Sequence, residues 1–112
     1  MGFDLAREEW PKISIVTICF NSEKTIRQTI SSVLQQTYKN IEYIVIDGGS
    51  EDNTLGIVEE YREKIDSLIS EKDEGIYDAV NKGISLCTGE LVALLHSDDY
   101  YSDGEVISKI AD

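Results

Sequence analysis

Two adjacent acidic residues, Asp98 and Asp99, lie shortly after an apolar run. His96, the only histidine of the chain, directly follows that run. The run covers residues 91–95 (LVALL) and begins shortly after Gly89. Five consecutive apolar residues with such flanks are typical of a strand buried on both faces, as in parallel sheets. A strand of this kind ends at the carboxyl edge of its sheet, where open α/β folds bind ligands.

Two neighbouring carboxylates repel each other, and a divalent cation relieves that repulsion. Hard oxygen ligands suit Mg²⁺ and Mn²⁺, so Asp98 and Asp99 form a candidate metal site. An acidic turn that caps the next helix is the more common explanation of an isolated pair, because carboxylates commonly serve in caps and turns. The choice between the two depends on the elements around the pair.

Strands and helices are expected to alternate along the chain. The apolar and β-branched runs at residues 13–20, 41–46 and 66–70 predict three further strands, the first of them central. Helical periodicity predicts helices that begin after a cap at Asn21 or Ser22 and end near Gln36, then over residues 54–63, 76–87 and 103–110. This order predicts a three-layer α/β/α fold with a mostly parallel sheet.

Parallel strands end at the same edge of a sheet. Asn21 and Asp47 follow or close the first two strands, and Asp98 and Asp99 follow the last. The topology therefore brings these four polar residues together, which favours a ligand site over an isolated acidic turn.

The composition indicates one globular domain. The chain has 112 residues, of which 41% are hydrophobic and 29% are charged. Its net charge of −12 excludes nucleic acid and anionic membranes as expected partners, because phosphates would be repelled. Residues 1–11 are expected to form an amino-terminal arm, and residues 12–112 the domain.

Cysteine usage and the lack of long apolar runs predict a cytoplasmic location. Cys19 and Cys87 lie inside apolar patterns, which predicts buried thiols in a reducing compartment, with a disulfide as the alternative. No run approaches the length of a membrane span, and residues 1–10 lack the apolar core of a signal peptide.

Two other classes of α/β domain fit this sequence less well. A dinucleotide-binding domain needs a glycine-rich turn after its first strand, where this chain has Phe20, Asn21 and Ser22. A phosphoacceptor receiver domain needs acidic residues at the same place.

Four ordered segments resemble one known family. They are residues 13–21 (ISIVTICFN), 32–54 (SVLQQTYKNIEYIVIDGGSEDNT), 73–90 (DEGIYDAVNKGISLCTGE) and 91–99 (LVALLHSDD). Together they resemble the amino-terminal, nucleotide-sugar-binding half of a family 2 glycosyltransferase with the GT-A fold. The resemblance covers about residues 12–104 and implies a truncated domain of this fold.

The resemblance implies a role for each matching residue. Phe20 and Asn21 match the pair beside the nucleotide base, and Asp47 matches the acidic residue that hydrogen-bonds the base, usually uracil. Asp98 matches the residue that faces the ribose. Asp99 matches the ligand of a divalent metal, Mg²⁺ or Mn²⁺, on the diphosphate.

Other matching positions have simpler structural explanations. Ser50, Asp52 and Thr54 match the rest of the turn after Asp47, and all three are good helix caps. Asp73, Glu74 and Asn81 are expected near the same pocket, where they could touch the sugar or the base. The favourable placement of acidic residues at a helix start is enough to explain the first two.

Three positions depart from the family's common pattern. His96 stands where many members have an acidic residue, and either a ligand, a sugar-pocket or a purely structural role would suit it. Gly48 stands where many members have a second aspartate. Val80 replaces an arginine before Asn81, which removes one expected phosphate or base contact.

The resemblance implies a reaction as well as a site. The expected activity is inverting transfer of a sugar from a nucleotide-diphosphate donor, a UDP-sugar, to a saccharide or lipid-linked acceptor in polysaccharide biosynthesis. With a lipid-linked acceptor, the full-length protein would lie at the inner face of the membrane. The alternative is a non-catalytic nucleotide-binding or interaction domain that keeps the fold.

The second, acceptor-binding half of such enzymes normally supplies the general base, and no such half is recognisable after Asp99. The 112-residue chain is therefore expected to hold only the donor and metal site and to be inactive alone. The catalytic base is unknown, with His96 as the remaining candidate. Surface left uncovered by that half makes a homo-oligomer an expected state.

Overall fold

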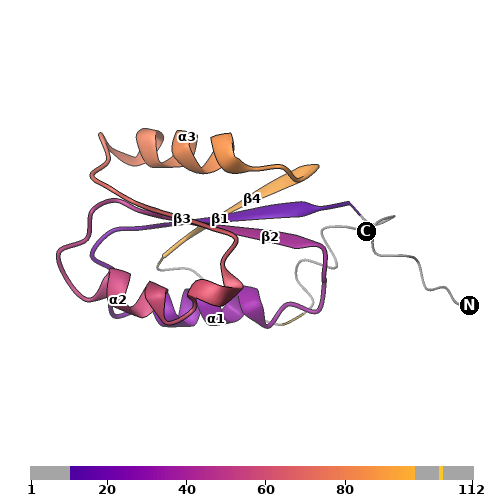
Figure 1. The fold of residues 1–112 in the computed structure, drawn as a ribbon, viewed down its shortest axis with the longest axis horizontal. Coiled ribbons are helices and arrows are strands. Elements are labelled where there is room, and N and C mark those ends of the chain that lie inside the picture. The colour runs from indigo at the N-terminus through magenta and orange to yellow at the C-terminus, as the bar shows by residue number, and fades with distance from the viewer. Residues whose placement is uncertain (1–10, 98–103, 105–112) are drawn as a thin grey trace, which may run out of the picture.

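The computed structural model describes residues 11–97 and Gly104, which form a sheet between two layers of helices (Figure 1). The described strands are β1 (Ile13–Cys19), β2 (Ile41–Asp47), β3 (Ser67–Ser70) and β4 (Leu91–His96). The described helices are α1 (Ile26–Leu34), α2 (Thr54–Glu59), the short 3₁₀ helix η2 (Arg62–Lys64) and α3 (Ile76–Leu86). The expected three-layer α/β/α fold is confirmed. The expected arm and last helix lie outside the described residues, apart from Pro11 and Gly104.

The sheet is parallel throughout its described part, with the strand order β3-β2-β1-β4. Its register aligns Cys19 of β1 with Asp47 of β2, and Asp47 with Ser70 of β3. On the other side, Ile18 of β1 pairs with His96 of β4. The expected convergence of strand ends at one edge is thus confirmed for the strands that are described.

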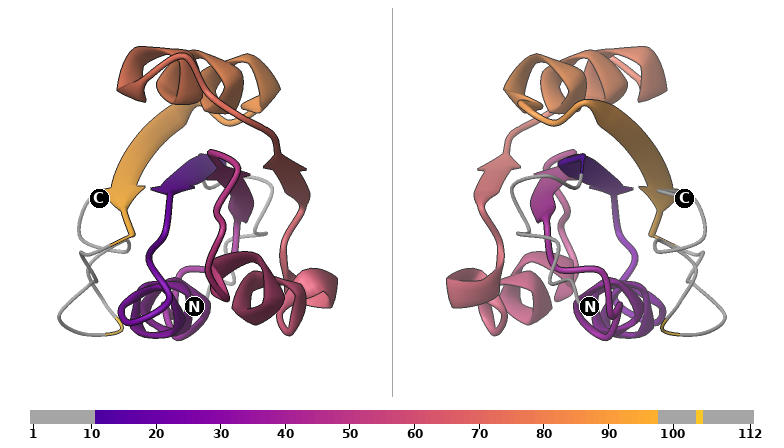
Figure 2. Two further views of the ribbon diagram at one scale, coloured as in Figure 1. Left: turned by 90° about the vertical axis from the view of Figure 1, so that its left-hand side faces the viewer. Right: turned by 90° about the vertical axis from the view of Figure 1, so that its right-hand side faces the viewer.

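Helices cover the two faces of the sheet unequally. Figure 2 shows α3 on one face and α1 with α2 on the other. Spacings of three and four residues put Ile26, Ile30 and Val33 on one side of α1, where they are buried in the larger core. On the opposite face, Ala79 of α3 packs against the smaller core around Val16.

The strand expected to be buried on both faces is an edge strand. β4 pairs with β1 alone among the described strands, and Leu95 is its only buried residue (Figure 2). Leu91, Val92 and Leu94 are 42%, 46% and 49% exposed. The prediction was wrong because an apolar run shows that a strand avoids water but not how many neighbours it has. The central position of β1 is confirmed, since all seven of its residues are buried.

Helix boundaries depart from expectation at two places. The residue that caps α1 is Thr25 rather than Asn21 or Ser22, and no side-chain hydrogen bond caps it. The second helix ends at Glu59 instead of residue 63, and the chain continues into η2. No helix within the described residues is long and apolar enough to cross a membrane.

Candidate functional site

A pocket of about 570 Å³ opens at the carboxyl edge of the sheet. The turn after β1 contributes Phe20, and the turn after β2 contributes Gly48 and Gly49. Asp73 lines the pocket from the loop ahead of α3, and His96 lines it from the end of β4. Four segments that are distant in sequence therefore build one cavity, as the parallel topology predicts.

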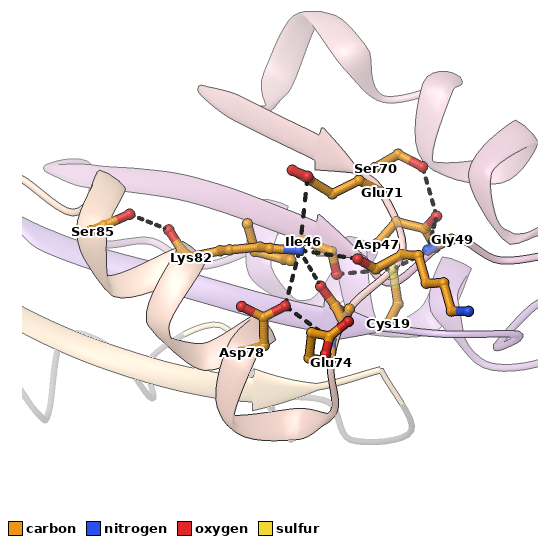
Figure 3. A network of polar contacts seen from close by, with 12 residues as sticks. Cys19, Ile46, Asp47, Gly49, Ser70, Glu71, Glu74, Asp78, Lys82 and Ser85 are labelled. Carbon is orange, nitrogen blue, oxygen red and sulfur yellow. Dashed lines mark hydrogen bonds and ion pairs between the residues drawn. The ribbon is translucent and has the colours of Figure 1, made fainter.

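Asp47 lies beneath the pocket and is fully buried. One carboxylate oxygen accepts hydrogen bonds from the backbone N–H of Ser50 at 3.1 Å and from the Ser70 hydroxyl at 2.8 Å. The other oxygen accepts a hydrogen bond from the Ser50 hydroxyl at 2.5 Å. Figure 3 shows Asp47 beside Ser70 and Gly49. These bonds give Asp47 a structural role, because its side chain holds the turn from inside, and its contact with the nucleotide base stays a prediction.

The thiol of Cys19 is buried beside Asp47, with the sulfur 3.6 Å from a carboxylate oxygen. Burial, and then the charge of Asp47, raise the pKa of this thiol far above its ordinary value. The thiol of Cys19 donates to Asp47 as part of the packing beneath the pocket. Cys19 and Cys87 are both free, as expected, although Cys87 is only partly buried.

Asn21 joins the turns that follow β1 and β2. Its backbone N–H donates to the Ser50 hydroxyl at 2.8 Å, and its side-chain oxygen accepts from the backbone N–H of Glu51 at 2.8 Å. Its φ of 48° lies in the left-handed region, which asparagine tolerates better than most residues. Asn21 thus fixes the position of Phe20, whose side chain is 57% exposed at the mouth of the pocket.

Ser50 and Asp52 also have structural roles in this turn. Asp52 accepts hydrogen bonds from the backbone N–H and the hydroxyl of Thr54, the first residue of α2. Desolvation is the largest single effect on the pKa of Asp52 and raises it, but the hydrogen bonds together outweigh it, so the pKa is lowered. The contacts of Asp52 are structural, but the residue that caps α2 is Asn53, and no side-chain hydrogen bond caps it.

The charged wall of the pocket is an ion-pair cluster around Lys82 of α3. Its ammonium lies 2.6 Å from Asp73, 3.3 Å from Asp78 and 4.0 Å from Glu71. Figure 3 shows the nitrogen between Glu71 and Asp78. The pKa of Lys82 is raised, chiefly by its hydrogen bond to Asp73. The pKa of Asp78 is lowered, chiefly by the hydrogen bond that it accepts from the backbone N–H of Glu74.

The end of β4 is anchored at Ser97, immediately before the acidic pair. Its backbone N–H donates to Ile18 at 3.1 Å, and its carbonyl accepts from the Thr29 hydroxyl at 2.8 Å. Its own hydroxyl lies 2.6 Å from that of Ser22. His96 is exposed and faces the pocket. The residue immediately before the acidic pair is thus held in place by three hydrogen bonds.

The expected sugar and metal ligands Asp98 and Asp99 lie outside the described residues. Within residues 11–97 and Gly104, no group of three or more histidine, cysteine or acidic side chains is arranged to hold a metal ion. The expected metal site therefore remains a prediction that rests on the two aspartates.

Sequence reasoning placed Asp73 near the pocket, which it lines, but favoured a helix-start role for it and did not single out Lys82. Asp73 does not cap α3: the helix begins after Gly75, which has no side-chain cap bond, and Asp78 accepts from the Glu74 backbone. The available signal was the loss of an acidic side chain at Gly48, which points to space that another residue could fill.

Comparison with known proteins agrees with this fold and shows the family. The sequence profile of glycosyl transferase family 2 matches residues 14–112. An uncharacterized glycosyltransferase of Mycobacterium tuberculosis, Rv1514c, is 39% identical over 100 residues, which are 88% of this chain and 38% of that protein. The chain thus spans less than half the length of this relative.

Solved structures show the same architecture. S. aureus TarS 1–349 in complex with UDP-GlcNAc superposes with a TM-score of 0.80 at 32% identity, over 89% of this chain and 30% of that one. The mannosyltransferase PcManGT of Pyrobaculum calidifontis, in complex with GDP-Man and Mn²⁺, also gives 0.80, over 100% of this chain and 36% of that one. Its 22% identity supports the fold alone. With the GT-A fold and a matching family profile, the chain belongs to glycosyl transferase family 2.

Proposed function

We propose that this chain binds a UDP-sugar at the carboxyl edge of its sheet, as the donor site of an inverting glycosyltransferase. The acceptor would be a saccharide or a lipid-linked sugar. The observation that carries the proposal is the pocket between Phe20, the glycine turn at Gly48 and Gly49, and Asp73. The relative TarS, 32% identical, has been crystallised with UDP-GlcNAc, which supports a uridine donor.

The glycine turn suits a ligand that approaches the backbone closely. Gly49 has a φ of +86°, and a Cβ there would lie 3.2 Å from the backbone of Lys72. A larger residue would strain the turn and crowd the neighbouring loop. The missing side chain at Gly49 thus lets the turn pack against the β3–α3 loop, while Gly48 and Gly49 line the pocket with backbone alone.

We further propose that Asp99 holds a divalent metal and that Asp98 contacts the ribose. Two carboxylates that follow an anchored Ser97 make an oxygen donor set that suits Mg²⁺ or Mn²⁺. A bound cation would stabilise the negative charge that develops on the departing diphosphate. The chain's own part is to orient the donor and to present its anomeric carbon.

Binding without transfer is the expected behaviour of the 112-residue chain. Inversion needs a base within hydrogen-bond reach of the acceptor hydroxyl, on the face of the sugar opposite the diphosphate. Of the described acidic residues at or beneath the pocket, Asp47 is buried, Asp73 is paired with Lys82, and Glu51 is exposed on the turn after β2. His96 is the candidate that the sequence suggested, and it lies on the strand end that leads into the proposed metal site.

Calorimetric titration with UDP tests the donor site. UDP should bind more tightly with Mn²⁺ than with a chelator present, and Asp99→Asn should abolish that difference because it removes a charged ligand. Glu63→Gln is the matched control, since Glu63 is an exposed residue of η2, away from the pocket. Equal binding with and without metal would contradict the metal site, and no binding of any nucleotide would contradict the donor site.

A transfer assay with labelled nucleotide sugars and a mixed acceptor extract tests the second part. The purified chain should bind the labelled donor without acceptor-dependent transfer of its sugar. Transfer that persists through purification and is lost in His96→Ala would show that His96 is the base after all.

A further inference from the structure

The carboxylate of Asp73 occupies the space that a side chain at position 48 would fill. A Cβ built on Gly48 would lie 2.6 Å from Oδ2 of Asp73 and 3.5 Å from Cδ1 of Phe20. The first distance is too short for any real Cβ, so an acidic side chain at 48 and Asp73 exclude each other in this arrangement. A carboxylate is thus present above the turn, but it comes from the β3–α3 loop.

Asp73 is held in place from one side only. Its Oδ1 accepts a hydrogen bond from the ammonium of Lys82 at 2.6 Å, and its side chain is only 12% exposed. Within residues 11–97, no hydrogen bond to Oδ2 is present, and this oxygen lies over Gly48 in the pocket. Lys82 therefore orients a charged acceptor toward the ligand space.

The opposite wall is the ring of Phe20, which approaches the same point above Gly48. An aromatic face together with an ionised acceptor suits a planar heterocycle that carries a ring N–H. Uracil presents such a donor at N3. Cytosine has an unprotonated acceptor at the same position, so it would leave the carboxylate unpaired and face it with a lone pair.

We propose that Asp73 reads the base of the donor by accepting the N3–H of uracil, with Gly48 providing the space and Lys82 positioning the carboxylate. This inference rests on the proposed donor site. It assigns base specificity to the β3–α3 loop in place of Asp47, which is buried under the turn.

The test compares UDP and CDP, which differ in the base alone. In Mn²⁺, the wild-type chain should prefer UDP by about 10- to 100-fold, the cost of leaving a partly buried charged group unpaired. Asp73→Ala should remove the preference. Glu71→Gln should keep it, because Glu71 also lies beside Lys82 but does not line the pocket.

Two further variants separate base reading from a loss of folding. Asp73→Asn keeps the shape and adds an N–H donor, so it should shift the preference toward CDP, which an unfolded chain cannot do. In the double variant Gly48→Asp/Asp73→Ala, the carboxylate returns from the other side of the same space. It should prefer UDP again, whereas Gly48→Asp alone should bind poorly, because two carboxylates would collide.

The outcomes distinguish this inference from the proposal beneath it. A wild-type chain that binds neither nucleotide would overturn both. If UDP binds and Asp73→Ala and Asp73→Asn keep the wild-type UDP:CDP ratio, the donor site stands and the role of Asp73 is wrong. If Asp73→Ala loses the preference for UDP and the double variant does not regain it, a carboxylate at position 48 cannot replace that of Asp73, and the inference is wrong.

Discussion

At the scale of single residues, the two carboxylates of this site differ, because one supports the turn and the other lines the pocket. Asp47 accepts hydrogen bonds from Ser50 in the turn after β2 and from Ser70 of β3 within the protein interior. Asp73 directs one oxygen at Lys82 and the other at the pocket. Both are aspartates near glycines, and the sequence shows no difference between them, because the direction of a side chain depends on the turn that carries it.

Removal of the Asp47 carboxylate should destabilise the fold. Asp47→Ala leaves the buried N–H of Ser50 and the hydroxyl of Ser70 without their acceptor, which should lower the free energy of unfolding by about 3 kcal/mol. Urea denaturation measures this. Glu63→Ala, at an exposed position, should stay within about 0.5 kcal/mol of wild type. Equal midpoints for the two variants would contradict a structural role for Asp47.

The buried thiol of Cys19 should make stability depend on alkaline pH. Its pKa is raised in the folded state, while the unfolded-state thiol ionises near its ordinary value of 9.0. Above that pH the folded state binds more protons than the unfolded state, so stability falls as pH rises, by up to about 1.4 kcal/mol per pH unit.

Chemical denaturation between pH 8 and pH 10 provides the measurement. Cys19→Ala should flatten the dependence, and Cys87→Ala should change it less, since that thiol is partly exposed. A slope that survives in Cys19→Ala would assign the effect to other groups.

At the scale of elements, the alternation of strands and helices was predictable, whereas the place of each strand in the sheet was not. β1 and β4 are both apolar runs, yet β1 pairs on two sides and β4 on one among the described strands. Burial of β1 comes from its neighbours β2 and β4 and from helices on both faces. Local sequence carries no information on such long-range partners.

The site was predictable to the same extent. Parallel topology predicted that the turns after β1, β2 and β4 meet, which the register confirms. It did not reveal that the β3–α3 loop brings Asp73 over Gly48, because that contact depends on the path of a loop and on an ion pair with Lys82.

A pair of substitutions distinguishes the central strand from the edge strand. Val16→Asp buries an unpaired charge at a position with no exposure and should prevent folding. Leu94→Asp, at a position that is 49% exposed, should retain the native circular dichroism and lower stability by about 1 kcal/mol or less. Unfolding of Leu94→Asp would mean that β4 is covered on both faces after all.

At the scale of the whole molecule, apolar exposure and net charge act in opposite directions. Val92 and Leu94 lie on the same face of β4 and are about half exposed. An apolar edge strand promotes association, while a net charge of −12 opposes it. Salt screens the repulsion and leaves the apolar contact intact.

We therefore expect the chain to self-associate, and more strongly at high salt. Sedimentation velocity over a range of concentrations should show dimers or larger species in 0.5 M NaCl, and Val92→Asp with Leu94→Asp should reduce them. A chain that stays monomeric at every concentration and salt would remove the expected homo-oligomer.

The most direct test of the donor site is to map UDP binding onto the chain by NMR. With 112 residues, the chain is small enough for amide shifts to be followed individually. In the presence of Mg²⁺, UDP should shift the amides of Phe20, Gly49 and Gly75, which line the pocket, and leave those of η2 unchanged. Saturable shifts confined to another surface, or none at all, would contradict a nucleotide-sugar site at this edge of the sheet.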